Sequence, residues 1–196
     1  MKINYLGYAF VVLLLIVCIK IYQDSDTFNL RCIISDVDGK KYCVRERSKL
    51  VLAADRLATV NQKMGKLVEH CRKNFPHREN VKRLCKGYNP KQVYETLPTS
   101  EYTAYSQNKG EKMAFCLNKE KNGHQLIDPN TLTFVALHEL SHIATESIGH
   151  GEEFWANFKF LLGEASKINI YQQVDYKKNP VRYCGTDVTD NPYYDL

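Results

Sequence analysis

Hydrophobic residues recur at helical spacing in the first half of the chain, over residues 49–73. The apolar positions that share one face of this segment are Leu50, Ala54, Leu57, Met64, Leu67 and Cys71. A helix of a globular domain buries such a face. Ser48 precedes the segment as a candidate N-cap and Pro76 ends it, which predicts one long helix. A shorter helix is expected over residues 79–86.

Four short segments have the composition of strands, and two turn sequences join them in pairs. The expected strands are residues 28–35, 41–47, 102–106 and 112–117. Gly39 lies in the turn of the first pair and Gly110 in the turn of the second. Turns of this kind connect neighbouring antiparallel strands. We therefore expect two small antiparallel hairpins.

The second half of the chain contains a helix with a clear N-terminal signal. Asp128 is placed as its N-cap and Pro129 as its first helical residue, and the pattern runs to about Glu146 or Ser147. The glycines on either side of His150 then break the helix. After the break we expect a helix over residues 152–166 and a tail of loops with a short strand over residues 168–196, which gives an α+β fold.

The N-terminal segment is apolar on all faces. Residues 3–19 form a run of 17 uncharged residues framed by Lys2 and Lys20. Such a helix is about 25 Å long, at the low end of a membrane span. The run is longer than the apolar part of a signal peptide, and no small-x-small cleavage site follows it. We expect a single-pass membrane protein with an uncleaved transmembrane anchor over residues 1–22 and a linker over 23–27; the side of the membrane is left open.

Residue composition and net charge indicate which class of protein this chain is and which binding partners to expect. Of the 196 residues, 44% are hydrophobic and 25% are charged, which is typical of a globular protein and excludes collagen-like or wholly disordered chains. The net charge of +5 is spread along the chain without a block of Lys and Arg. We therefore do not expect nucleic acid as a partner.

Seven cysteines leave the redox state open. Cys18 lies in the apolar segment, and the other six are compatible with three disulfides or with reduced thiols in a cytosolic domain. Cys32 and Cys43 flank the first hairpin turn, so they would lie nearly opposite each other and could form a disulfide. No Cys-x-x-Cys pair occurs, which argues against a cysteine-rich structural zinc site.

The strongest chemical signal is the pentapeptide His138-Glu139-Leu140-Ser141-His142. Two histidines four residues apart lie on one face of a helix and can bind one zinc ion. Glu139 lies beside them and can take a proton from the zinc-bound water and deliver it to the leaving amine. The pattern predicts zinc-dependent hydrolysis of a peptide bond by Glu139.

A catalytic zinc ion needs a third protein ligand. His150 is the first choice because its flanking glycines allow a sharp turn, and the carboxylate alternatives are Glu146, Glu152 and Glu153. Tyr183 is a candidate to stabilise the oxyanion. The strand around residues 113–117 is a candidate edge for binding an extended peptide substrate.

These residues resemble the WLM and SprT-like metallopeptidases, in which a His-Glu-x-x-His helix is followed by a histidine that opens the next helix. The resemblance covers residues 112–196 with some specificity, through the pentapeptide, His150-Gly151-Glu152-Glu153-Phe154-Trp155 and the tail from residue 179 to 185. It implies a zincin-like domain over residues 28–196, with its active-site core at about 100–167, zinc ligands His138, His142 and His150, and catalysis by Glu139. The tail resembles versions encoded by large DNA viruses and some protists, which implies a host or virion membrane.

The chain departs from the better-known members of that family, which are soluble nuclear proteases acting on proteins crosslinked to DNA. It carries a predicted anchor, and its spacing from His142 to His150 is longer than is usual. We therefore predict a membrane-anchored zinc metalloendopeptidase. The competing hypotheses are a non-catalytic zinc-binding structural or interaction protein of a membrane, and a DNA-associated protease.

Overall fold

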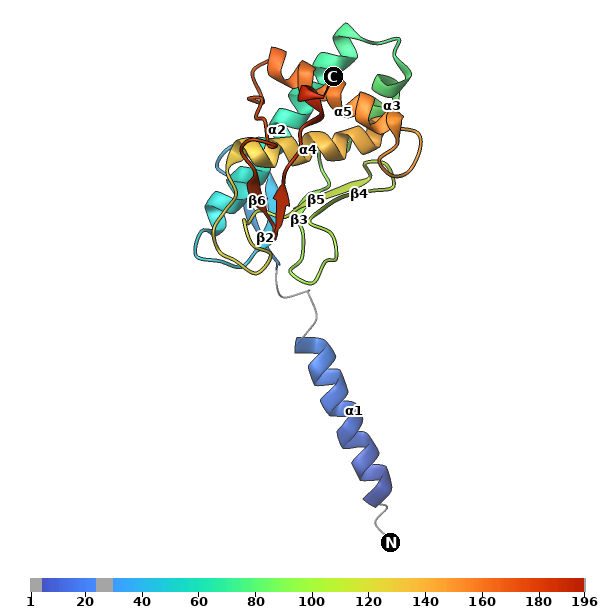
Figure 1. The fold of residues 1–196 in the computed structure, drawn as a ribbon. Coiled ribbons are helices and arrows are strands. Elements are labelled where there is room, and N and C mark those ends of the chain that lie inside the picture. Colours follow the sequence, from blue (N-terminus) through green and yellow to red (C-terminus); the bar gives the residue numbers. More distant parts are fainter. Residues whose placement is uncertain (1–4, 24–29, 196) are drawn as a thin grey trace.

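The computed structural model describes residues 5–23 and 30–195, which form five α-helices, seven short strands and a final 3₁₀ turn (Figure 1). The helices are α1 (Tyr5–Gln23), α2 (Leu50–Asn74), α3 (Glu79–Gly87), α4 (Pro129–Ala144) and α5 (Glu152–Lys167). The strands are β1 (Leu30–Ile34), β2 (Lys41–Arg45), β3 (Val93–Glu95), β4 (Ala104–Gln107), β5 (Lys112–Phe115), β6 (Val181–Tyr183) and β7 (Thr186–Val188), and the 3₁₀ turn is η2 (Pro192–Tyr194).

The expectation of a transmembrane helix, and of the membrane location that followed from it, was wrong. Among the described residues, no helix combines the length and the apolar character needed to cross a bilayer. The uncharged run has 17 residues, fewer than the roughly 20 that the hydrocarbon core requires. The large apolar side chains of α1 from Tyr8 to Ile21 are exposed, and most of the expected linker over 23–27 lies outside the described residues.

The core forms around α4, which packs against α2, α3 and α5. Nearly every residue of α4 from Thr131 to Ala144 is buried, so this helix runs through the interior rather than along the surface. Helix α2 contributes the buried face that its sequence predicted, including Leu57, Met64 and Leu67. The chain is α+β, as expected, with helices α2 to α5 grouped on one side of a small sheet (Figure 1).

The sheet beside the helices has the strand order β3-β5-β4. Strand β5 pairs with β4 in antiparallel and with β3 in parallel, so the expectation of purely antiparallel strands was wrong. Strand β3 has only three residues and lies between two proline-containing loops, so the sequence pattern did not predict it. Because β5 is the central strand, the expected substrate edge at residues 113–117 is internal, and β4 forms an outer edge.

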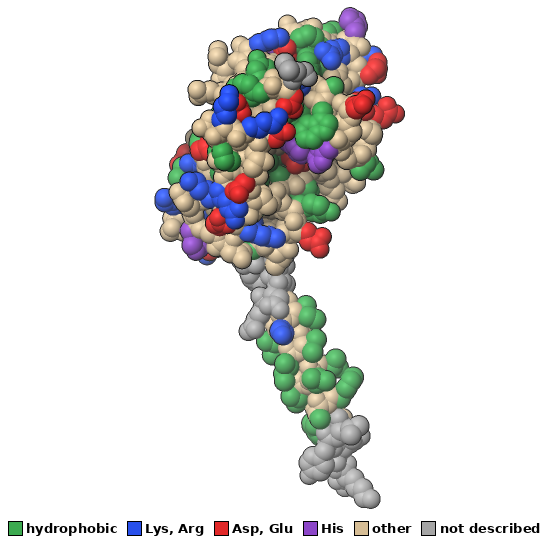
Figure 2. Space-filling view, viewed as in Figure 1, with side chains coloured by type: hydrophobic (Ala, Val, Ile, Leu, Met, Phe, Trp, Pro, Cys, Tyr) green, Lys and Arg blue, Asp and Glu red, His purple; other side chains and the backbone are tan. Residues whose placement is uncertain are grey.

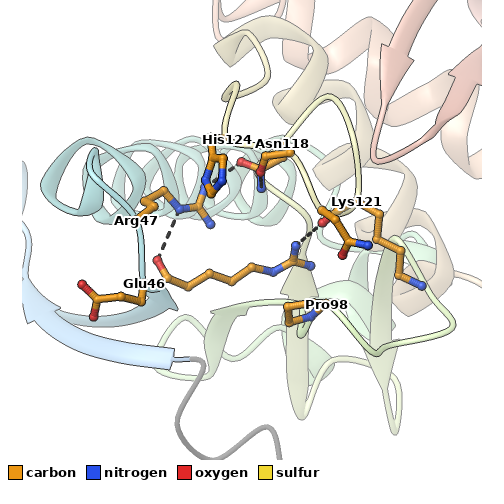
Figure 3. A pocket seen from close by; sticks show the side chains of 9 residues that line it. Glu46, Arg47, Pro98, Asn118, Lys121 and His124 are labelled. Atoms are coloured by element: carbon orange, nitrogen blue, oxygen red, sulfur yellow. Dashed lines mark hydrogen bonds between the residues drawn. The ribbon is translucent and has the colours of Figure 1, made fainter. Parts of the chain in front are cut away.

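A buried ionic network joins the β1–β2 hairpin to this sheet. Arg47 pairs with Glu95 and donates to Asn118 Oδ1 over 2.7 Å, and the Nε atom of Arg45 donates to the carbonyl of Thr96 over 2.6 Å. The side chains of Arg47 and Glu95 are almost fully buried. A cavity of about 180 Å³ lies beside the two arginines (Figure 3), and His124 lines it. The guanidinium groups are thus held by protein partners.

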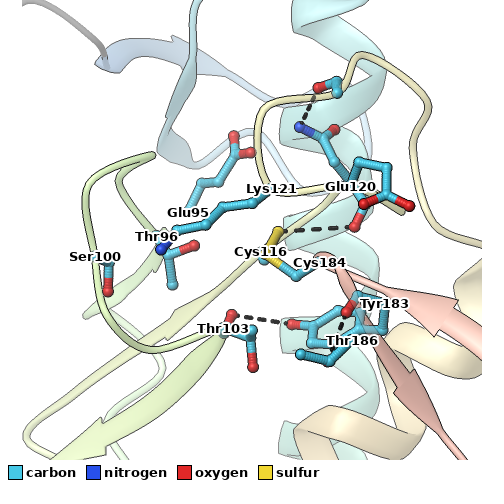
Figure 4. Close-up of a disulfide and its surroundings, with 12 residues drawn as sticks. Glu95, Thr96, Ser100, Thr103, Cys116, Glu120, Lys121, Tyr183, Cys184 and Thr186 are labelled. Atoms are coloured by element: carbon cyan, nitrogen blue, oxygen red, sulfur yellow. Dashed lines mark hydrogen bonds between the residues drawn. A yellow bond between two sulfur atoms is a disulfide. The ribbon is translucent and has the colours of Figure 1, made fainter.

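Two disulfides constrain the chain. The expected bond between Cys32 and Cys43 is confirmed, and these residues are directly paired across β1 and β2. The second bond joins Cys116 to Cys184, 68 residues apart, and fastens the tail to the chain just after β5 (Figure 4). Cys18, Cys71 and Cys85 are free thiols.

Candidate metal centre

Helix α4 fixes the first two histidines of the site. The side chain of Asp128 caps the helix by accepting hydrogen bonds from the backbone N–H groups of Asn130 (3.0 Å) and Thr131 (2.8 Å), and Pro129 occupies the first turn. These are the capping interactions that the sequence predicted. His138 and His142, one turn apart, then lie on the same face, and their Nε2 atoms are 3.2 Å apart.

The chain between α4 and α5, residues 145–151, forms a tight elbow that returns His150 to this face. Helix α4 ends at Ala144, earlier than expected, because Thr145 has an extended backbone (φ −93°, ψ 136°). Gly149 has φ of 88°, a left-handed conformation that favours glycine, and Gly151 is the N-cap residue of α5.

The three imidazoles meet at one point. The Nε2 atom of His150 lies 3.1 Å from that of His138 and 3.2 Å from that of His142. Tetrahedral ligands at zinc distances of 2.0–2.1 Å lie about 3.3 Å from one another. The triangle of nitrogens therefore has the size required for three ligands of a single zinc ion, and leaves a fourth position for water or substrate.

The carboxylate alternatives lie outside this triangle. Of the described residues, the only group of three or more potential ligands within reach of one ion is the histidine triad. The Glu146 side chain is 83% exposed and faces Arg83 at 3.5 Å. Glu153 pairs with the same arginine, and Glu152 is exposed. The structure therefore brings together the predicted trio and none of the glutamates.

Burial sets the protonation of the cluster. Desolvation, followed by the neighbouring His142 and His150, lowers the pKa of His138 to about 3. Desolvation, followed by His150 and Lys109, lowers the pKa of His142 to about 4. Both rings are consequently neutral near pH 7, which is the form of imidazole that binds a metal. His150 is exposed, so one side of the cluster is open to solvent, and Figure 2 shows histidine side chains at the surface beside hydrophobic ones.

An aromatic platform supports the three rings. The ring centroid of Phe154 lies 4.9 Å from that of His138, 4.5 Å from His142 and 4.6 Å from His150. Phe154 is fully buried, and the Trp155 ring lies 5.8 Å from His150 and is 42% exposed. The first turn of α5 thus packs against all three candidate ligands.

Glu139 is buried within α4. It lies between the two histidines of α4 in sequence, and only 5% of its surface is exposed. Burial raises the pKa of its carboxyl group to about 8. A carboxyl group with a raised pKa holds a proton more readily than a solvated one.

Tyr183 has a different environment from the one expected of an oxyanion stabiliser. Its side chain is 3% exposed, and its hydroxyl donates to the carbonyl of Thr103 over 3.2 Å (Figure 4). Desolvation, followed by the charge of Glu139, raises its pKa. The structure therefore places Tyr183 inside the protein beside Glu139, where the adjacent Cys116–Cys184 bond holds the tail.

Sequence reasoning missed one residue that contacts the site. Lys109, in the turn between β4 and β5, donates from Nζ to carbonyls of α4 and of the elbow. The sequence predicted the turn around Gly110, but it did not indicate that Lys109 would contact α4 and the elbow. Of the remaining histidines, His70 contacts Glu164 over 2.8 Å and His77 is exposed.

Comparisons with known proteins identify viral relatives. The chain is 31% identical over 161 residues to uncharacterized protein R325 of Acanthamoeba polyphaga mimivirus, covering 80% of this chain and 81% of the relative. It is 37% identical over 71 residues to uncharacterized protein 136R of Invertebrate iridescent virus 6, covering 35% and 38%. No family model and no solved structure matches, so the resemblance to WLM and SprT-like enzymes stays a prediction.

Proposed function

We propose that this chain, which belongs to the family of viral proteins that includes protein R325 of Acanthamoeba polyphaga mimivirus, is a zinc-dependent metallopeptidase. The observation that carries the proposal is the triangle of Nε2 atoms, with sides of 3.1 to 3.2 Å, two of them on the helix that also carries the buried Glu139. A histidine triad with an open fourth position is typical of catalytic zinc sites, whereas structural sites are closed by four protein ligands.

Each residue then has a defined task. His138, His142 and His150 hold the ion, and Phe154 keeps their rings in place by packing against all three. Bound zinc supplies a Lewis acid and brings the pKa of a coordinated water toward neutrality. Glu139 takes up the proton of the attacking water and passes it to the leaving amine of the cleaved peptide bond.

The substrate class follows from the sheet edge near the site. Strand β4 pairs with β5 along one side only and packs against α4, the helix that carries Glu139. An extended peptide can add to such an edge through main-chain hydrogen bonds. We therefore propose an unfolded or flexible protein segment as substrate, bound along β4 in place of the edge expected at residues 113–117.

The proposal is tested by cleavage of an unfolded protein substrate by the full chain loaded with zinc. The matched control is Glu139→Gln, which keeps the size of the side chain and removes its capacity to accept a proton. We expect cleavage that a chelator abolishes, with at least a 100-fold lower rate for the variant. If the zinc-loaded chain cleaves no protein tested while Glu139→Gln binds zinc equally well, the chain is instead a non-catalytic zinc-binding protein.

A further inference from the structure

The elbow that carries His150 is held from outside by a lysine of the β4–β5 turn. The Nζ atom of Lys109 donates to the carbonyl of His142 over 3.2 Å, of Thr145 over 2.7 Å and of Ser147 over 2.8 Å. The first two carbonyls lie at the C-terminal end of α4, where backbone acceptors lack partners within the helix and a positive charge is favourable. The third lies further along the elbow, three residues before His150.

The backbone of this turn is built to fix the position of the lysine. Asn108 and Lys109 have φ of 47° and 55°, and Gly110 has φ of 104°. A left-handed conformation is unfavourable for lysine, so the packing around the turn must impose it. That packing is close: a Cβ atom added to Gly87, at the end of α3, would lie 2.3 Å from the Lys109 carbonyl oxygen. The turn therefore rests on the α3 backbone, and the direction of Lys109 is set by the fold.

Lys109 and Arg83 contact different parts of the chain around the site. Arg83 donates to the Ala144 carbonyl over 2.8 Å and pairs with Glu153 of α5, so it holds the ends of the two helices. Lys109 instead joins the carbonyl of a candidate ligand, His142, to the carbonyl of Ser147 within the elbow. It thus fixes the path of the chain from the second candidate ligand toward the third.

We propose that Lys109 is a positioning residue that holds the elbow so that His150 completes the zinc site. This inference rests on the proposed metal centre. Lys109 itself binds neither metal nor substrate; it sets the distance between His150 and the pair on α4. Partners that orient a ligand in this way typically change metal affinity by about 10- to 100-fold when they are lost.

The role of Lys109 is tested with a neutral substitution that keeps the length of the side chain. Lys109 borders a cavity of about 690 Å³ that is also lined by Lys86 and Ile143, so the side chain is not enclosed by the core. Lys109→Met keeps a long unbranched side chain and removes the charge and the donors. Lys86→Met makes the same change at another residue that lines this cavity and is the matched control.

The experiment measures zinc affinity of the full chain by competition with a chelator, with the melting temperature of the metal-free protein as a check on folding. We expect Lys109→Met to weaken zinc binding about 10-fold or more, Lys86→Met to leave it unchanged, and Lys109→Arg to restore most of it. The absorption spectrum of bound Co²⁺ provides a second readout, because it reports coordination number. In Lys109→Met we expect it to shift toward that of His150→Ala.

A double variant, Lys109→Met with His150→Ala, tests whether Lys109 affects zinc affinity by positioning His150 or by stabilising the protein in general. If Lys109 acts through His150, adding Lys109→Met to His150→Ala causes no further loss of affinity. An equal loss in both backgrounds, or wild-type affinity in Lys109→Met, would overturn the inference. Absence of zinc binding by the wild-type chain is a different result, because it overturns the metal centre itself.

Discussion

The Nε2 atoms of His138 and His150 lie 3.1 Å apart although the two residues are twelve positions apart in the sequence. The first lies inside a buried helix, and the second lies on an exposed elbow that ends at the next helix. Two basic nitrogens at this distance, with a third from His142 at 3.2 Å, are best satisfied by sharing one metal ion.

His150→Ala removes one corner of the triangle and should weaken zinc binding by more than 100-fold, beyond the effect of losing an outer partner. Glu146→Ala should change the affinity less than about threefold, because its side chain is 83% exposed and faces Arg83 instead of the triad. Chelator competition on the two variants checks the prediction. The opposite ranking would assign the third ligand to the carboxylate.

The only tryptophan of the chain provides an optical readout of the site. Trp155 lies 5.8 Å from His150 between ring centroids. We expect its fluorescence to be quenched when Co²⁺ binds, with saturation at one equivalent, because a coloured transition-metal ion quenches an indole close to it. The double variant His138→Ala/His142→Ala is the control. Quenching of similar size and affinity in that variant would place the ion elsewhere.

The Arg–Glu network should be important for stability. Glu95→Gln leaves the buried guanidinium groups of Arg45 and Arg47 without their carboxylate, which typically costs about 3–5 kcal/mol. Glu46→Gln breaks an exposed pair with Arg31 and should cost at most about 1 kcal/mol. Urea unfolding of both variants gives the comparison. Equal free energies of unfolding for the two would show that the network contributes little.

The two disulfides should differ in their effect on stability. Cys116–Cys184 closes a much longer loop than Cys32–Cys43, with sequence separations of 68 and 11. Loop-closure entropy then makes the longer bond more stabilising by about 1.5 kcal/mol. The pairs of serine substitutions, compared by thermal unfolding under non-reducing conditions, measure this difference. The account would be contradicted if removing Cys32–Cys43 proved the more destabilising.

The parts of the fold that local sequence specifies were predicted well. Asp128 and Pro129 form the expected start of α4, and the glycines around His150 form the expected break. Cys32 and Cys43 form the expected bond because a hairpin brings neighbouring segments together. Each of these features depends on residues within about a dozen positions of one another.

The features that were missed depend on contacts between distant segments. Strand β3 is only three residues long and exists through its parallel pairing with β5. Cys116 and Cys184 meet through the return of the tail, and Lys109 meets the elbow through the packing of its turn on Gly87. The prediction of a transmembrane anchor was wrong for another reason. An apolar run of 17 residues is at the lower limit of the length that spans a membrane.

The zinc content of the purified full chain tests the central claim most directly. After dialysis against metal-free buffer, metal analysis should find one zinc ion per wild-type chain and none in the variant His138→Ala/His142→Ala. Both proteins should retain the same helix content, since His138 and His142 are only partly buried and are not among the fully buried residues of α4. A wild-type chain without zinc that also fails to take up added zinc, or a double variant that keeps its zinc, would contradict the account.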